Sequence, residues 1–154
     1  MPRTLGVAVD LENLRDGLRP LLALLRRLDP EGGVLHLVGG PWAQALLADA
    51  DVPGGWRARR EVSLDRDQGA DDVIHHLLDA WRLERRVVVV ASSDGGFDVS
   101  LAAAHLEGVP TFVVTTGKPA RRLRDVAEVH RLMGPDDVAA AAAAIDEARG
   151  NDDR

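Results

Sequence analysis

RVVVVAS, residues 86–92, is the stretch of sequence that decides the fold. It is a short and continuous apolar run that ends in a polar residue. Such runs are typical of strands that are buried on both faces, as in a parallel sheet covered by helices. We therefore expect a buried strand here, with the serines and aspartates that follow it lying at the end of that strand.

Apolar runs of the same kind recur along the chain and alternate with helical patterns. The runs are TLGVAVD (4–10), GVLHLVG (33–39) and PTFVVTT (110–116), and WRARREVS (56–63) is a weaker candidate for an edge strand. Helices are expected over residues 18–28, 42–50, 70–84, 98–107, 119–129 and 136–149. This alternation predicts an α/β fold, a three-layer α/β/α sandwich around a mostly parallel central sheet.

Composition and charge exclude several classes of protein. The chain has 154 residues, which favours one domain, and the absence of Cys excludes disulfides, thiolate zinc sites and a cysteine nucleophile. No apolar stretch approaches the roughly 18 residues of a membrane helix, and the first run is too short for a signal peptide, so we expect a cytoplasmic protein with no membrane partner. The net charge of −6 argues against a nonspecific nucleic-acid coat. It does not exclude a nuclease, because bound metal ions supply local positive charge.

Polar residues gather after the predicted strands, where ligands bind in an open α/β sheet. They are Asp10 and Asn13 after the first strand, Asp71 and Asp72 at the start of the helix 70–84, Ser92, Ser93, Asp94 and Asp98 after the strand 86–92, and Thr115, Thr116 and Lys118 after the strand 110–116. Carboxylates brought together repel unless a cation lies between them, and Mg²⁺ and Mn²⁺ prefer such oxygen ligands. The pattern therefore predicts a metal site that can activate water for phosphodiester hydrolysis. Its candidate ligands are Asp10, Asp71, Asp72, Asp94 and Asp98.

A purely structural interpretation exists for some of these acids. Asp and Ser are common helix N-caps, and acids are favoured near helix N-termini, so Asp71, Asp72 and Asp94 could each be a cap. Asp10 is different, because it ends a buried strand at the point where the chain should turn. The joint pattern favours a functional site.

Several motifs, taken in order, resemble the NYN domain, a branch of the PIN-like nucleases. They are V-x-V-D-x-x-N at 7–13, G-A-D-D at 69–72 and V-V-x-S-S-D-x-x-F at 89–97. GVPTFVVTT (108–116) and L-R-D-V-A-E (123–128) are similar to segments of LabA-like bacterial members. The resemblance runs from about residue 4 to 132. It implies an NYN/PIN-like domain over 1–134, with a Rossmannoid fold and Mg²⁺- or Mn²⁺-dependent cleavage of RNA.

The resemblance also implies roles for single residues. Asp10, Asn13 and Asp94 match family positions, and Asp71 or Asp72 matches the acid that opens the central helix. Two positions depart from the LabA-like pattern, since Gln68 replaces a lysine and Gly96 replaces an acid. Asp98 lies four residues after Asp94, as in the regnase-type branch, and is a plausible replacement for the missing acid.

Substrate and partner residues complete the hypothesis. Asn13, Ser92 and Ser93 would orient the metal shell or a phosphate, and Lys118, Arg121 and Arg122 would contact the RNA backbone. The alanine-rich helix within 135–154 is either part of the domain or a docking element for a protein partner or a second copy. His75 and His76 lie one turn after Asp71 and Asp72 and are weaker candidates for metal ligands.

Proteins that bind single-stranded RNA often stack its bases on exposed aromatic side chains, and such side chains are scarce in this sequence. Phe97 and Phe112 look buried, and only Trp42 and Trp56 follow turns where they could be exposed.

Two other functions stay open. The first is a catalytically degenerate NYN domain that acts as a regulatory or protein-binding module. The second is a phosphoryl-accepting receiver-like domain, suggested by Asp10, Ser92 and Lys118, although an acid in good context is missing after the third strand.

Overall fold

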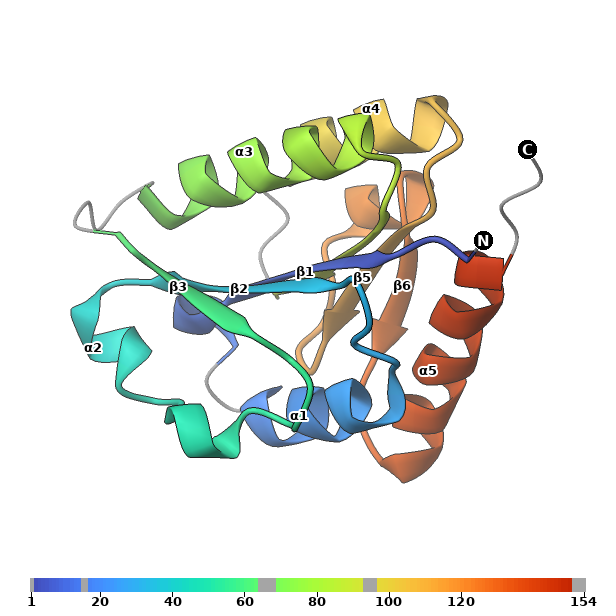
Figure 1. Cartoon of the computed structure of the whole chain (residues 1–154). Helices are drawn as coiled ribbons and strands as arrows, with labels where there is room; N and C mark the ends of the chain where they lie inside the picture. The colour runs from blue at the N-terminus through green and yellow to red at the C-terminus, as the bar shows by residue number, and fades with distance from the viewer. Residues whose placement is uncertain (1, 15–16, 64–68, 93–96, 151–154) are drawn as a thin grey trace.

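The computed structural model describes residues 2–14, 17–63, 69–92 and 97–150. These residues form a six-stranded sheet with the strand order β3-β2-β1-β4-β5-β6 (Figure 1). The strands are β1 (Leu5–Asp10), β2 (Val34–Gly39), β3 (Ala58–Val62), β4 (Val87–Ala91), β5 (Thr111–Thr115) and β6 (Glu128–Arg131), and every pairing between neighbours is parallel.

Helices cover both faces of the sheet, which confirms the predicted three-layer α/β/α sandwich. In Figure 1, α3 and α4 lie on one face and α1 and α5 lie on the other. The helices are α1 (Leu18–Arg27), α2 (Pro41–Gln44), α3 (Gly69–Leu83), α4 (Asp98–Leu106) and α5 (Pro135–Gly150). Short 3₁₀ helices are η1 (Leu11–Asn13), η3 (Asp49–Asp51) and η4 (Arg121–Asp125). None of the helices in the described ranges combines the length and apolar content needed to cross a membrane.

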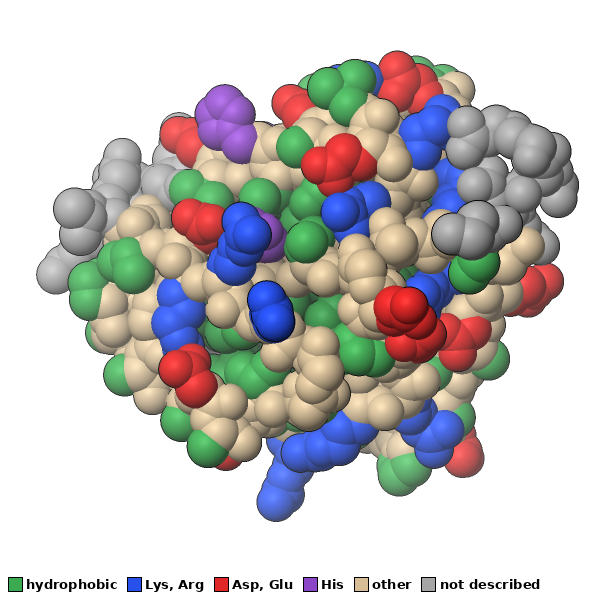
Figure 2. Space-filling model, in the orientation of Figure 1, with side chains coloured by type: hydrophobic (Ala, Val, Ile, Leu, Met, Phe, Trp, Pro, Cys, Tyr) green, Lys and Arg blue, Asp and Glu red, His purple; other side chains and the backbone are tan. Residues whose placement is uncertain are grey.

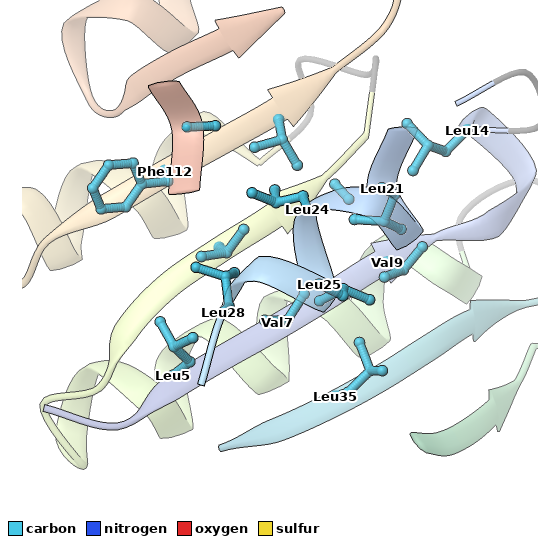
Figure 3. Close-up of a cluster of buried hydrophobic side chains, with 14 of the residues drawn as sticks. Leu5, Val7, Val9, Leu14, Leu21, Leu24, Leu25, Leu28, Leu35 and Phe112 are labelled. Carbon is cyan, nitrogen blue, oxygen red and sulfur yellow. The ribbon is translucent and has the colours of Figure 1, made fainter. Parts of the chain in front are cut away.

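The core has two halves, because successive side chains of a strand point to opposite faces. Val7 and Val9 of β1 join the half that packs against α1, α2 and α5, part of which is drawn in Figure 3. Ala8 joins the other half, with Ile74 and Leu78 of α3. This double burial explains why the central strands are apolar throughout.

Gly6 lets α3 lie directly against the central strand. A Cβ added at Gly6 would lie 2.7 Å from Cε3 of Trp81, and it would be closer still to Cδ2. Trp81 is itself only 3% exposed. The glycine is therefore required by the close approach of a large ring, not by backbone conformation.

The helix α5 belongs to the same core as the rest of the chain. Its buried side chains include Val138, Ala141 and Ile145, which pack with α1 and the sheet. Near its end, Arg149 Nε donates a hydrogen bond to the carbonyl of Arg3 (2.9 Å). Its Nη1 donates to the carbonyl of Asp29 (2.9 Å).

One predicted helix is wrong. Residues 119–129 were expected to be helical, but the chain forms the 3₁₀ helix η4 and then the edge strand β6. Of the apolar side chains Leu123, Val126 and Ala127 in this stretch, only Leu123 is fully buried. The last two residues of the expected helix, Glu128 and Val129, instead pair with β5 as the start of β6.

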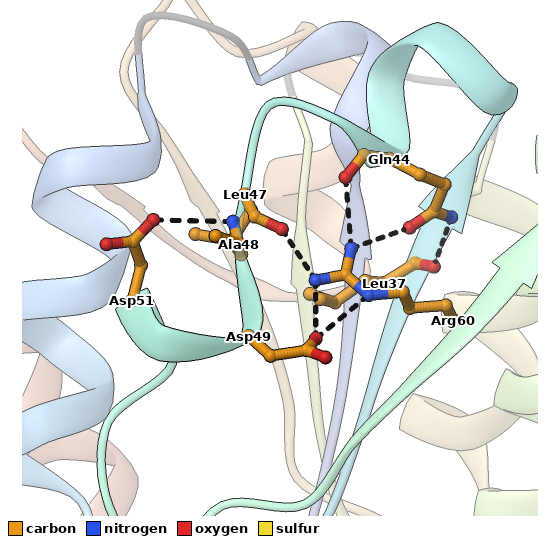
Figure 4. Close-up of polar contacts among 7 residues, drawn as sticks. All are labelled: Leu37, Gln44, Leu47, Ala48, Asp49, Asp51 and Arg60. Carbon is orange, nitrogen blue, oxygen red and sulfur yellow. Dashed lines mark hydrogen bonds and ion pairs between the residues drawn. The ribbon is translucent and has the colours of Figure 1, made fainter.

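The predicted helix 42–50 is also shorter than expected. It ends at Gln44 because Arg60 of β3 reaches across and hydrogen-bonds the carbonyls of Gln44 (3.0 Å) and Leu47 (2.6 Å) (Figure 4). Arg60 also pairs with Asp49 at 2.7 Å. These contacts satisfy carbonyls that a longer helix would have used internally.

The aromatic side chains follow the predictions in part. Phe97 and Phe112 are buried, as predicted, and Trp42 is 50% exposed. Trp56 also follows a turn where it could be exposed, but it is 7% exposed and its Nε1 donates a hydrogen bond to the carbonyl of Leu25 (3.0 Å). The ring belongs to the same buried cluster as Leu24 and Leu25 of α1.

Candidate functional site

The order of strands defines one special position in the sheet. From β1 the chain adds β2 and β3 on one side, then crosses to add β4, β5 and β6 on the other. The switch point therefore lies between β1 and β4, and ligands of open α/β sheets bind beyond the carboxyl ends of the strands at this point. We call the edge formed by these strand ends the carboxyl edge.

Asp10 lies at the switch point and is fully buried. It is the last residue of β1, and its exposed fraction is 0%. Its Oδ2 accepts a hydrogen bond from Asn13 Nδ2 (2.7 Å) and a second from Ser92 Oγ (2.9 Å). Burial of a carboxylate is costly unless hydrogen bonds or a cation compensate it, so these donors help to hold Asp10 in place.

The two donors lie directly after the two strands that flank the switch point. Asn13 ends η1, the single 3₁₀ turn that follows β1 directly, and Ser92 follows β4 and is 1% exposed. The structure thus brings three predicted site residues together. The chain after β1 reads Asp10-Leu11-Glu12-Asn13 and holds none of the glycines of a dinucleotide-binding turn.

Glu12 lies between Asp10 and Asn13 and connects β1 with the end of β2. Its Oε1 accepts a hydrogen bond from the backbone N–H of Gly40 (3.0 Å), just beyond the end of β2. A Cβ at Gly40 would lie 3.0 Å from the same oxygen. This contact joins residues that are 28 positions apart, so no local pattern in the sequence could reveal it.

The remaining predicted acids divide into three groups. Asp71 and Asp72 lie in the first turn of α3, where Asp71 is half-buried and Asp72 is exposed. Asp98 lies in the first turn of α4 and forms an ion pair with Arg122 of η4, at 3.5 Å. Asp94 falls outside the described residues, as do Ser93, Gln68 and Gly96.

No complete metal cage is formed by the described residues alone. Within 2–14, 17–63, 69–92 and 97–150, no three acidic or histidine side chains lie close enough together to hold a metal ion. Asp10 offers oxygen ligands of the kind that Mg²⁺ and Mn²⁺ prefer.

Basic residues lie farther along the carboxyl edge. Lys118 follows β5 and is exposed, and Arg121 and Arg122 are exposed in η4. Arg122 shares its charge with Asp98 through the ion pair. Figure 2 shows basic and acidic side chains interspersed on the face that carries β3 and α2, so the described part of that face offers no continuous basic stripe.

His75 has a structural contact. Its Nδ1 is hydrogen-bonded to Ser100 Oγ at 2.6 Å, which joins α3 to α4, and its ring lies beside Phe97. His76 is exposed on the same helix. The hydrogen bond to Ser100 gives His75 a structural role that requires no metal ion.

Comparisons with known proteins find structures of similar fold but identify no family. No protein-family model matches the sequence, and no curated protein matches it either. Among solved structures, the chain is similar to a protein of unknown function from Vibrio parahaemolyticus, with a TM-score of 0.62 and 13% identity over 88% of this chain and 95% of that one. It is also similar to a 3-dehydroquinate dehydratase-like protein from Bifidobacterium longum, with a TM-score of 0.50 and 16% identity over 96% and 97% of the two chains. At these identities the likeness shows the α/β/α architecture alone.

Proposed function

We propose that the protein is a cytoplasmic metal-dependent endoribonuclease of the NYN type. The observation that carries the proposal is Asp10, a fully buried carboxylate at the switch point of a parallel sheet, which accepts hydrogen bonds from the segments that follow both flanking strands. A core position at this depth is usually apolar. An acid at this position is favoured when it has a ligand to bind.

The donor set fits a hard divalent cation. Asp10 would hold Mg²⁺ or Mn²⁺, and the resemblance adds Asp94 and either Asp71 or Asp72. Such an ion supplies an activated water and neutralises charge on the phosphate during phosphodiester hydrolysis. Asn13 and Ser92 fix the carboxylate of Asp10 through their hydrogen bonds, so they act as positioning residues.

The RNA backbone would lie along the carboxyl edge. Lys118 and Arg121 are exposed at the β5 end of that edge and can contact phosphates. Arg122 can do so when it leaves Asp98, because the pair is exposed and therefore weak. Asp98 is then released to serve as a further acid.

A degenerate NYN domain is the second candidate, and the Asp98–Arg122 ion pair favours it. An acid that is neutralised by an arginine does not need a metal. The substitutions at Gln68 and Gly96 point the same way. This alternative predicts a protein partner or a second copy and no metal-dependent cleavage.

A cleavage assay separates the two functions. Mixed single-stranded RNA is incubated with EDTA, Mg²⁺ or Mn²⁺, using the parent protein, Asp10→Asn and Asp146→Asn. Asp146 is an exposed acid on α5, near the opposite end of the domain, and it controls for the chemical change itself. We expect metal-dependent cleavage by the parent and by Asp146→Asn, and a loss of at least about a hundredfold in Asp10→Asn. Cleavage by Asp10→Asn at the parental rate would end the proposal.

Metal binding can be measured without any RNA substrate. A ligand at a hundred times its Kd stabilises the folded protein by about 2.7 kcal/mol, which corresponds to a rise in Tm of about 5–10 °C for a chain of this size. We expect Mn²⁺ to raise the Tm of the parent and not that of Asp10→Asn. Equal shifts in both proteins would place the metal elsewhere, and no shift in the parent would favour the degenerate domain.

A further inference from the structure

Trp42 differs from the other two tryptophans in its exposure. Trp56 and Trp81 are 7% and 3% exposed, whereas Trp42 is 50% exposed. Val62, at the end of the edge strand β3, is 53% exposed. Two exposed apolar side chains therefore lie near the carboxyl ends of two adjacent strands, Trp42 shortly after β2 and Val62 as the last residue of β3.

These two side chains share one end of the carboxyl edge. In the pairing of β2 with β3, Val62 lies opposite Gly39. The Cβ position of the next residue, Gly40, is 3.6 Å from Trp42 Cδ1 and 3.5 Å from the carbonyl of Ser63, the residue after Val62. The indole ring and the end of β3 thus flank the same glycine.

The ring is also close to the candidate catalytic position. Gly40 donates its backbone N–H to Glu12, and Glu12 lies two residues after Asp10. The Cβ position of Gly40 is 3.0 Å from Glu12 Oε1 and 3.6 Å from Trp42 Cδ1, so the ring and this carboxylate lie against the same glycine. A chain of nucleotides that lies on Asp10 would therefore pass Trp42 on the β2–β3 side.

The short helix that carries Trp42 is firmly held. Gln44, two residues later, donates hydrogen bonds to the carbonyls of Leu37 in β2 (2.9 Å) and Glu61 in β3 (3.1 Å). Arg60 donates to the Gln44 carbonyl, as Figure 4 shows. Since α2 is tied to both strands, the backbone that carries the ring is held in place before any ligand arrives, and less backbone entropy is lost on binding.

We propose that Trp42, backed by Val62, is a stacking subsite for a nucleobase of single-stranded RNA. The inference rests on the proposed function and adds a site for the base to it. Aromatic rings stack on bases of any identity, so the subsite would contribute affinity without strong sequence preference. Four strand spacings, about 19 Å, separate the ends of β3 and β5. The base would thus stack at one end of the carboxyl edge while Lys118 and Arg121 contact phosphates at the other, with Asp10 between them.

A protein partner fits this surface less well. A stable protein interface buries roughly 800 Å² on each partner around a contiguous apolar centre. Among the described residues, this surface offers the exposed apolar side chains of Trp42 and Val62, with Leu46 (41% exposed) on the same segment as Trp42. Its size matches a base better than the centre of an interface.

Intrinsic fluorescence gives a direct test, because Trp42 is the exposed tryptophan among the three. A single-stranded RNA of about ten nucleotides is added in EDTA, which prevents metal-dependent cleavage. The proteins are the parent, Trp42→Ala, Trp42→Phe, Asp10→Asn and the control Leu106→Ala. Leu106 is 84% exposed at the end of α4, away from the carboxyl edge.

We expect RNA to quench the emission of the parent and of Asp10→Asn. Trp42→Ala should weaken RNA binding about fivefold to a hundredfold, Trp42→Phe should restore most of the affinity, and Leu106→Ala should bind like the parent. Equal unfolding midpoints of the parent and Trp42→Ala verify that the variant folds.

The outcomes that overturn the subsite are distinct from failure of the nuclease. If Trp42→Ala binds RNA as tightly as the parent, the subsite is wrong, whether or not the parent cleaves RNA. If the substitution instead changes the sedimentation of the protein and not its RNA affinity, the surface is a protein contact. If the parent cleaves no RNA but its binding and quenching depend on Trp42, the subsite stands and the catalytic proposal fails.

Discussion

The hydrogen bond between Ser92 and Asp10 can report whether the buried carboxyl carries a charge. Ser92 Oγ lies 2.9 Å from Asp10 Oδ2, and both residues are buried. A hydrogen bond to a charged group contributes about 1.5–3 kcal/mol to stability, whereas one between neutral groups contributes about 0.5–1.5 kcal/mol. Asp10→Asn keeps an acceptor oxygen for Ser92 and removes the charge. We therefore expect Ser92→Ala to cost about 1.5–3 kcal/mol in the parent and about 1 kcal/mol less in the Asp10→Asn background.

The measurement is a double-mutant cycle. Each protein is unfolded in urea, in EDTA at neutral pH, and far-UV circular dichroism monitors the unfolding. For a chain of this size, the larger cost lowers the Tm by about 3–12 °C. Ser100→Ala is the matched control, since Ser100 is also buried but its hydroxyl is bonded to His75. Its cost should be the same with Asp10 and with Asn at that position, because the two sites share no partner.

Equal costs of Ser92→Ala in the two backgrounds would refute the reasoning. That result would mean that the hydrogen bond gains nothing from a charge on Asp10. A neutral carboxyl is a poor metal ligand, since ligands must be deprotonated. The metal site would then lose its central residue.

Three further outcomes follow from contacts elsewhere in the molecule. Gly6→Ala should lower the free energy of unfolding in urea by about 1–3 kcal/mol, because its Cβ would overlap the ring of Trp81. The control Gly54→Ala, whose Cβ position is open, should cost less than about 0.5 kcal/mol. Equal costs of the two substitutions would contradict this packing. Arg60→Lys should destabilise the folded protein by about 1–3 kcal/mol and speed proteolysis after residue 44, because an ammonium cannot make all the contacts of the guanidinium. Unchanged proteolysis would show that other contacts hold the loop. Asp98→Asn should change the free energy of unfolding by less than about 1 kcal/mol, because its ion pair is exposed. The same substitution should lower the rate of Mn²⁺-dependent cleavage at least about tenfold. An unchanged cleavage rate would exclude Asp98 as an acid of the site.

The strands were predictable where burial on both faces leaves a continuous apolar run. The runs at 4–10, 33–39, 86–92 and 110–116 all became strands, and 56–63 contains the edge strand β3. The strand β6 was not predictable, because its sequence, Glu-Val-His-Arg, has no apolar run and its place depends on pairing with β5. An edge strand of four residues is specified by its neighbour more than by its own residues.

The candidate site was likewise predictable from the sequence only in part. The position of Asp10 at the end of a buried strand was visible in the sequence, and so was the acid-rich start of α3. The contacts of Glu12 with Gly40 and of Asp98 with Arg122 were not visible, because they join residues far apart in the chain. Long-range polar contacts depend on loop paths that local patterns do not encode.

The contacts of Arg149 have a practical consequence. The backbone N–H of Arg3 donates a hydrogen bond to the Arg149 carbonyl (2.8 Å), so the two ends of the described chain are adjacent, at the amino ends of the strands. A fluorophore or fusion attached at either end would emerge on the side opposite Asp10 and leave the carboxyl edge accessible. A short linker from residue 150 to residue 2, with new ends opened at the exposed Gly54–Gly55 turn, would give a circular permutant that keeps every strand pairing.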